Sequence, residues 1–223
     1  SAIDQFYDDF SIRHLSDIDI LINKNDLHHL IKILRENGFH TKIWDKLKGS
    51  NFQLYKNPSP KHKSLPCQVD IHTSIFGNEN RDKIFKDFLK AKTVKSQKFS
   101  NKINICPPEL LFIHLLYHGT VHSQYNVGPV FFMDMINILS SNKIEWAKAS
   151  SLVKKFNLQK ELNYVLTALQ EYADIPKDLD FKEQVNKNML KVIFLSPPYN
   201  TGLLRPLSKE GVGNQIRFIF AHM

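Results

Sequence analysis

The hydrophobic pattern divides the chain into a first half of short apolar runs and a second half with helical periodicity. Up to about residue 105, apolar runs of strand length alternate with amphipathic stretches. From Pro107 onward, apolar residues recur every three or four positions, which is the period of an α-helix. We therefore expect an α+β fold, with a mixed sheet and flanking helices in residues 1–105 and an all-helical domain in residues 106–223.

The first half is predicted to contain both strands and helices. Strands are expected over residues 17–22, 39–44, 51–55 and 67–75, with short edge strands at Val94 and at 103–105. Helices are expected over residues 1–10, over 27–37 with Gly38 closing the helix, and around the apolar positions 84–89. The Pro- and Lys-rich stretch 57–66 is predicted to be a solvated loop.

The second half is predicted to be helical as far as the Pro197-Pro198 pair. Four helices are expected over residues 108–122, 129–140, 145–156 and 159–173, and Pro176 prevents the last from continuing. A further helix is expected over residues 181–195. The basic and aromatic tail, 201–223, has no assignment.

Composition and charge narrow the possible partners and compartment. The chain has 30 Lys+Arg against 22 Asp+Glu, so its net charge is +8. This excess suits a polyanionic ligand such as a nucleoside triphosphate or RNA, but an ordinary basic surface explains it equally well. The two cysteines, Cys67 and Cys106, cannot form a disulfide framework or a four-cysteine zinc site, which favours a reducing, cytoplasmic compartment. No apolar run reaches the roughly 20 residues of a membrane span, so we expect no membrane partner.

Two carboxylates in the first predicted strand are the strongest chemical signal. Side chains alternate along a strand, so Asp17 and Asp19 share one face, and Ile18, Ile20 and Ile22 share the other. Neighbouring carboxylates repel each other, and a divalent cation such as Mg²⁺ is the usual compensation. A third carboxylate, Asp70, lies in the apolar run 68–72. If the two strands are adjacent, three acids meet. Ordinary solvated aspartates on a surface strand are the alternative.

The order of these residues resembles the nucleotidyltransferase superfamily of polymerase β type. More narrowly, it resembles an uncharacterised bacterial nucleotidyltransferase group whose signature runs Lys-Gly, then Arg-x-x-x-Asp-x-Asp-hydrophobic, then hydrophobic-Asp-hydrophobic-His. The matching residues are Arg13, Asp17, Asp19, Asp70 and His72. The likeness continues into the helical half through the histidine-bearing stretch 108–122 and the runs 132–135 and 144–146.

The resemblance implies an Mg²⁺-dependent (or Mn²⁺-dependent) enzyme that moves NMP from a nucleoside triphosphate to a hydroxyl. Asp17 and Asp19 would hold both ions of a two-metal site, and Asp70 would hold the ion next to the acceptor hydroxyl. Arg13 would offer donors to triphosphate oxygens. His72 would orient a ligand or a phosphate, and a structural hydrogen bond is the alternative. The residues do not select among RNA, protein and small-molecule acceptors.

Further nucleotide contacts are expected from Ser1 and from a row of histidines. The superfamily's Gly-Ser phosphate-binding turn precedes its first aspartates, and we expect Ser1 to be the Ser of that turn. Histidines 114, 118 and 122 recur every four residues, which brings neighbouring rings together on a helix. We expect His118 and His122 to bind nucleotide between the two halves. A zinc-dependent hydrolase on this helix is an alternative, but it lacks a suitably spaced general base.

A different class of function also fits the resemblance. The chain could be a non-catalytic module that keeps the nucleotidyltransferase fold and binds RNA or a partner protein. The intact set of three aspartates argues against this reading, because a degenerate site no longer needs all three acids.

If Ser1 belongs to a phosphate-binding turn, a chain extended by its preceding residues should bind nucleoside triphosphate more tightly than one that begins at Ser1. Such turns use Gly because the backbone must approach the phosphates closely. The measurement is the triphosphate affinity of the two chains, side by side at fixed Mg²⁺. Equal affinities would remove Ser1 from the phosphate-binding turn.

Overall fold

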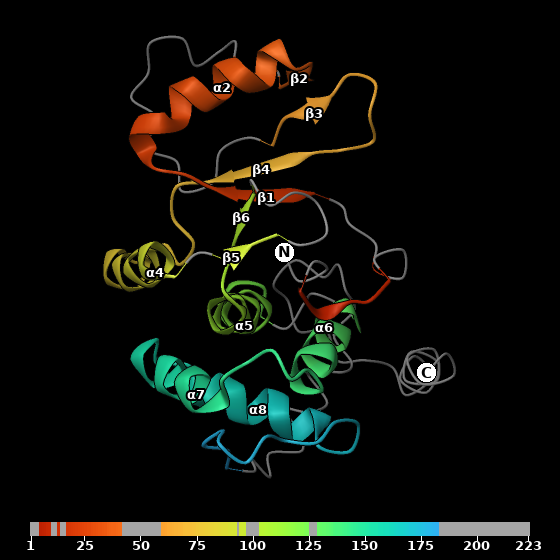
Figure 1. Cartoon of the computed structure of the whole chain (residues 1–223), viewed down its shortest axis with the longest axis vertical. Coiled ribbons are helices and arrows are strands. Elements are labelled where there is room, and N and C mark those ends of the chain that lie inside the picture. Colours follow the sequence, from red (N-terminus) through yellow and green to blue (C-terminus); the bar gives the residue numbers. More distant parts are fainter. Residues whose placement is uncertain are drawn as a thin grey trace. The chain divides into compact units, whose positions relative to one another are not determined.

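The computed structural model describes residues 5–9, 13, 17–41, 59–92, 94–96, 103–124 and 129–182 (Figure 1). They form two compact units, one within Ser11–Asp87 and the other within Ser1–Phe10 and Phe88–Met223. Helices combine with small sheets, which confirms the α+β class. The domain boundary expected after residue 105 stays a prediction. The strand expected over 51–55, the tail 201–223 and nearly all of the helix expected over 181–195 lie outside the described residues.

The unit within Ser11–Asp87 is built on a parallel pair of strands. β1 (Ile18–Leu21) lies beside β4 (Val69–His72), and Asp19 is in register with Asp70. Both strands are rich in β-branched residues, which suit a pleated, half-buried surface. Each strand has four residues and is shorter than expected. Beyond β4, the backbone N–H groups of Ile75 and Phe76 donate hydrogen bonds to the side chain of Asp82 and not to a neighbouring strand.

Two shorter strands and one helix complete the packing around this pair. β2 (Phe39–His40) pairs antiparallel with β3 (Lys61–His62), and an isolated bridge joins Lys61 to Gln68 beside β4. α2 (Leu27–Glu36), which follows a 3₁₀ turn at Lys24–Asp26, covers one face of β1 and β4 (Figure 1). Gly38 ends α2 as expected, with a φ of +85°.

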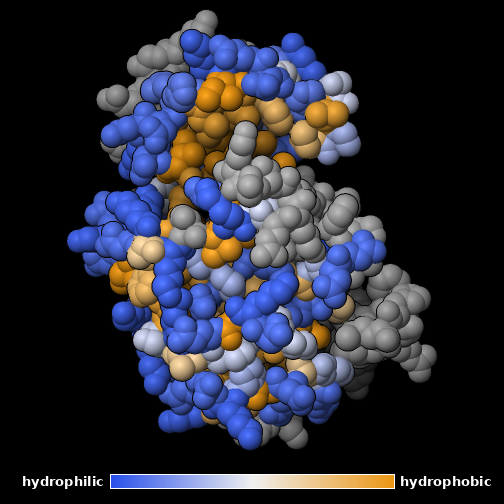
Figure 2. Space-filling view, in the orientation of Figure 1, coloured by the Kyte–Doolittle hydropathy of each residue, from blue (hydrophilic) through white to orange (hydrophobic). Residues whose placement is uncertain are grey.

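The apolar core of this unit lies between α2 and the strand pair. Leu27 and Leu34 of α2 are buried together with Val69 and Ile71 of β4, and the partly buried residues around them are Ile20, Ile22, Leu30, Ile31 and Phe39. Figure 2 shows apolar side chains at α2 on the face in view. Because strand side chains alternate, Asp19 and Asp70 occupy the face opposite this core. Ile18, expected on the apolar face, is 51% exposed at the start of β1.

The second unit is mainly helical, as expected. α4 (Glu79–Ala91), whose residues up to Asp87 belong to the first unit, leads to β5 (Val94–Lys95) and β6 (Asn104–Ile105), which pair antiparallel. The remaining helices begin within one residue of the predicted starts, and they are α5 (Pro108–Tyr117), α6 (Pro129–Leu139), α7 (Trp146–Lys155) and α8 (Gln159–Leu169). At the centre of α5, Phe112, Ile113 and Leu116 are fully buried.

The N-terminal residues pack into this helical unit. Gln5 and Tyr7 are buried, and the Tyr7 hydroxyl donates a hydrogen bond of 2.5 Å to Asp134 Oδ1 in α6. The Gln5 amide donates to the carbonyl of Cys106 at 2.6 Å, and Lys143 Nζ donates to the carbonyl of Gln5. Buried polar groups need such partners, so these bonds fix residues 5–7 against the helices.

The helix expected over 108–122 changes its winding near its end. α-Helical geometry stops at Tyr117, and a π-helical turn continues over His118–His122, where the Ser123 N–H donates to the His118 carbonyl at 2.9 Å. Such wide turns are rare and occur often at functional sites. Gly119, inside this turn, lies against α6, and a Cβ at Gly119 would be 2.4 Å from Phe131 Cε2.

Gly119→Ala is therefore expected to destabilise the protein by about 1–3 kcal/mol, since the added methyl group overpacks a buried contact. Thermal unfolding should show a fall in Tm of about 2–4 °C per kcal/mol for a chain of this size. Val121→Ala, an exposed change in the same turn, is the control, and the further change Phe131→Leu should restore part of the loss. An unchanged Tm for Gly119→Ala would contradict the close contact.

Candidate active site

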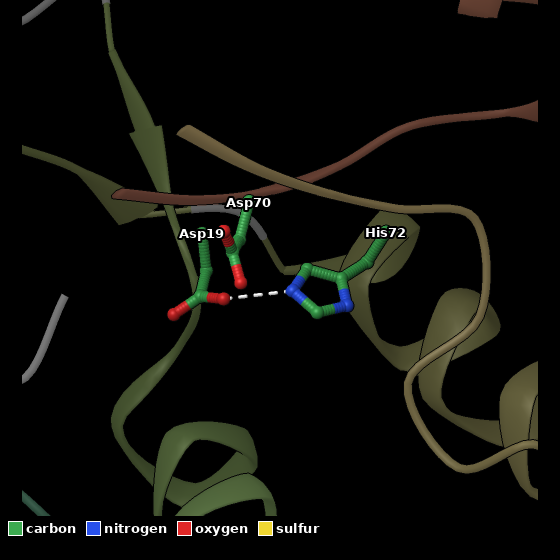
Figure 3. Close-up of side chains that lie close together, drawn as sticks. All are labelled: Asp19, Asp70 and His72. Atoms are coloured by element: carbon green, nitrogen blue, oxygen red, sulfur yellow. Dashed lines mark hydrogen bonds and ion pairs between the residues drawn. The ribbon is translucent and has the colours of Figure 1, made fainter. Parts of the chain in front are cut away.

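Three potential metal-ligating side chains converge on the face of the β1–β4 pair opposite α2. Asp19 comes from β1, and Asp70 and His72 come from β4 (Figure 3). One ligand atom from each lies within 4.8 Å of the other two. Within the described part of the chain, this is the one group of three such side chains that meets this distance limit.

The convergence follows directly from strand geometry. Asp19 and Asp70 are paired in register on adjacent parallel strands, so their side chains leave the sheet on the same face as near neighbours. His72 lies two residues after Asp70 and therefore shares that face. The expected adjacency of the two acidic strands is thus present, and no residue of the group needs a loop to bring it in.

The three side chains differ strongly in exposure. Asp70 is only 3% exposed, and it accepts a hydrogen bond of 3.2 Å from the amide of Gln68. The side chains of His72 and Asp19 are 24% and 61% exposed. The group therefore runs from a buried carboxylate to one that solvent and a ligand can reach.

A direct bond between Asp19 and His72 reduces the repulsion between the two carboxylates. His72 Nε2 lies 2.7 Å from Asp19 Oδ1, and Figure 3 shows the Asp70 carboxylate directed toward this pair. The bond requires a proton on Nε2, which both the neutral Nε2–H tautomer and the imidazolium carry. In either form, the N–H dipole or the positive charge faces Asp19 and offsets part of the negative charge of the group.

The turn after β4 is fixed by a single carboxylate from α4. Asp82 Oδ1 accepts the backbone N–H groups of Ile75 and Phe76 at 2.8 and 3.1 Å, and its other oxygen accepts the hydroxyl of Ser74. Lys86 Nζ also donates to the carbonyl of Thr73 at 3.0 Å. These bonds begin at the residue after His72, so they hold the end of the strand that carries it.

The other residues expected at the site lie outside this group. Asp17 is half-buried at the position directly before β1 and is not one of the three converging side chains. Arg13 is half-buried further upstream. Ser1 lies outside the described residues. Their expected roles in metal and nucleotide binding stay predictions.

The expected ring contacts among the helix histidines are present. The rings of His114 and His118 have centroids 6.0 Å apart, and those of His118 and His122 are stacked at 5.2 Å. His118 and His122 are exposed. In the described part of the chain, these histidines join no group of three ligand atoms within 4.8 Å.

Burial raises the pKa of the Cys106 thiol to about 12, so this thiol is protonated at neutral pH and is not a ready zinc ligand. The arrangement therefore lends no support to a zinc hydrolase.

Two residues that shape the site were not singled out in the sequence. Gln68 could have been found, because it precedes Asp70 by two positions and strand alternation puts it on the same face. Asp82 carried no such signal. It lies in a helix, and only the folded turn brings it to the amides of Ile75 and Phe76.

Asp82→Ala should lower the free energy of unfolding by about 1–3 kcal/mol, because buried amide groups after β4 lose their acceptor. Asp87→Ala, at an exposed position of the same helix, is the control and should change stability by less than about 0.5 kcal/mol. Urea denaturation of the two variants and the wild type measures both effects. Equal losses in the two variants would mean that the Asp82 bonds do not stabilise the turn.

Comparison with protein-family models assigns the chain to a family. No described helix combines the length and hydropathy needed to cross a membrane. Comparison with curated proteins and with solved structures gave no match. A family model described as "uncharacterised nucleotidyltransferase" matches residues 1–174, which is most of the 223-residue chain. The aspartate-bearing strands β1 and β4 and all the helices from α2 to α8 lie within the match. The chain therefore belongs to the uncharacterised nucleotidyltransferase family.

Proposed function

We propose that the protein is a metal-dependent nucleotidyltransferase that moves NMP from a nucleoside triphosphate to a hydroxyl acceptor. The observation that carries this proposal is the in-register pair Asp19 and Asp70, whose carboxylates converge with His72 within 4.8 Å. Membership of a nucleotidyltransferase family supports the same chemistry.

The donor group fits a divalent cation. Two carboxylates on one sheet face are costly to hold together without positive charge, and Mg²⁺ is typically bound by one or two carboxylates plus substrate phosphates. Two ligands of one Mg²⁺ ion lie at most about 4.2 Å apart, twice the Mg–O distance of about 2.1 Å. The ligand atoms of Asp19, Asp70 and His72 lie within 4.8 Å of one another, so small side-chain rotations would bring them within about 4.2 Å.

In this proposal Asp17, Asp19 and Asp70 hold Mg²⁺ or Mn²⁺. The bound ions would stabilise the charge that develops on the attacking and leaving oxygens. The acceptor oxygen forms a bond to the α-phosphorus, the bond from that phosphorus to the bridging oxygen breaks, and pyrophosphate leaves. Asp70 is the residue proposed to take the proton of the acceptor hydroxyl, because it is the buried acid of the group.

The remaining expected residues are assigned to the nucleotide. Arg13 and Ser1 are proposed to donate hydrogen bonds to the triphosphate, since Arg presents several donors in a planar fork and Ser a hydroxyl. The exposed, stacked rings of His118 and His122 are proposed to bind nucleotide. The net charge of +8 suits this polyanionic substrate.

The acceptor is proposed to be RNA, a protein side chain or a small molecule that carries a free hydroxyl. We assign the reaction to the cytoplasm, where the free thiols Cys67 and Cys106 would remain reduced. ATP is the first triphosphate to test among the four.

Asp19→Asn should reduce nucleotidyl transfer by more than about 100-fold, since loss of even an outer-shell partner of a metal ligand costs about 10–100-fold. The fold should be kept or slightly stabilised, because the change removes one of two crowded negative charges. The assay is pyrophosphate release from each of the four triphosphates with total RNA or total protein as acceptor. Melting temperature is measured in parallel.

Asp87→Asn, an exposed change in α4, is the matched control and should keep full activity. Activity of Asp19→Asn near that of the wild type, or collapse of its fold, would contradict the assignment of Asp19 as a metal ligand. Calorimetric titration with triphosphate and Mg²⁺ measures whether the wild type binds them. Binding without pyrophosphate release would support a non-catalytic binding module and not an enzyme.

A further inference from the structure

The candidate metal group contains a nitrogen donor as its third member. Asp19 and Asp70 supply carboxylate oxygens, whereas His72 supplies an imidazole nitrogen within 4.8 Å of an oxygen from each. His72 Nε2 is 2.7 Å from Asp19 Oδ1, a distance that two ligands of one ion can have once the Nε2 proton has moved to Nδ1 or to solvent. A histidine that only donates a hydrogen bond to a carboxylate ligand can lie away from the ion. His72 instead lies where both carboxylates converge.

The surrounding structure holds His72 in this position. Its strand β4 is paired along its whole length with β1, and the chain turns directly after it through the bonds to Asp82. The His72 side chain is also less exposed than that of Asp19, at 24% against 61%. A ligand on a short, paired strand reaches an ion with little further ordering, so the entropic cost of recruiting this imidazole is small.

The donor chemistry then selects the ion. Mg²⁺ prefers oxygen ligands and keeps several waters, whereas an imidazole nitrogen suits transition metals such as Zn²⁺, Fe²⁺ and Ni²⁺. We infer that His72 is a direct ligand and that the Asp19–Asp70–His72 group takes a divalent transition-metal ion in preference to Mg²⁺. This inference rests on the proposed function, of which it specifies the cation.

Mn²⁺ is the probe for the test, because its unpaired electrons report the ligand nuclei directly. Pulsed electron paramagnetic resonance of the Mn²⁺-loaded full chain, in a buffer without nitrogen ligands, should show ¹⁴N coupling from a bound imidazole. The coupling should disappear in His72→Gln. It should persist in His40→Gln, which changes an exposed histidine in β2. Retention of the coupling in His72→Gln, or its absence in the wild type with Mn²⁺ bound, would overturn direct ligation.

Metal affinities, measured by calorimetry, test the selectivity. The wild type should bind Mn²⁺ at least 10-fold more tightly than Mg²⁺. His72→Gln should lose about 10–100-fold in Mn²⁺ affinity and less than about 3-fold in Mg²⁺ affinity. His72→Asp, which makes the group all-carboxylate, should shift the preference toward Mg²⁺. Equal losses for both ions in His72→Gln would instead assign His72 a positioning role and overturn the inference.

This failure is distinguishable from failure of the proposed function. If Mn²⁺ and Mg²⁺ bind as tightly to Asp19→Asn as to the wild type, the group is not a metal centre and both proposals fall. If Asp19→Asn weakens both ions while the wild type shows no ¹⁴N coupling, the metal centre stands and only the role of His72 is wrong. The coupling is measured on the wild type, so the test survives even if His72→Gln fails to fold.

Discussion

The register of β1 against β4 is the constraint on which the candidate site depends. Asp19 pairs with Asp70, and the neighbouring pair Ile20 and Ile71 points to the opposite, apolar face under α2. A slip of one residue would turn one strand's carboxylate into the core and its isoleucine into solvent. The burial of Ile71, which is complete, therefore makes the slipped register unfavourable. The apolar face that stabilises this small unit also specifies which carboxylates meet.

Asp19 and Asp70 place two carboxylates close together on one face of the β1–β4 pair, which is electrostatically unfavourable. Asp70 is a buried carboxylate in register with a second carboxylate, and such groups need polar partners. The amide of Gln68 and the pair formed by Asp19 and His72 offset part of this cost. Crowded carboxylates disfavour folding. A crowded pair whose cost is offset by specific polar side chains is typical of a functional site.

Strand alternation and helical periodicity were enough to predict the main features. They placed Asp19 and His72 on a shared face with Asp70 once the strands were adjacent, and they located α2 and α5 to α8 closely. They did not predict the ends of β4, the π-helical turn or the partners of Tyr7. Each of these depends on contacts between residues far apart in the sequence, such as Asp82 with the turn after β4 or Phe131 with Gly119. Local pattern carries no information about such contacts. The predicted strand started at Asp17, and β1 begins one residue later, at Ile18.

The burial of Tyr7 in the helical unit has a consequence for the order in which the chain folds during synthesis. Tyr7 leaves the ribosome before its partner Asp134, which lies 127 residues further along the chain. The unit within Ser11–Asp87 is continuous in sequence and can form while synthesis proceeds, whereas the helical unit must wait for α6 before it can enclose its own first segment. Until then Tyr7 remains uncovered. The β1–β4 pair can thus form on the ribosome before Tyr7 gains its partner Asp134.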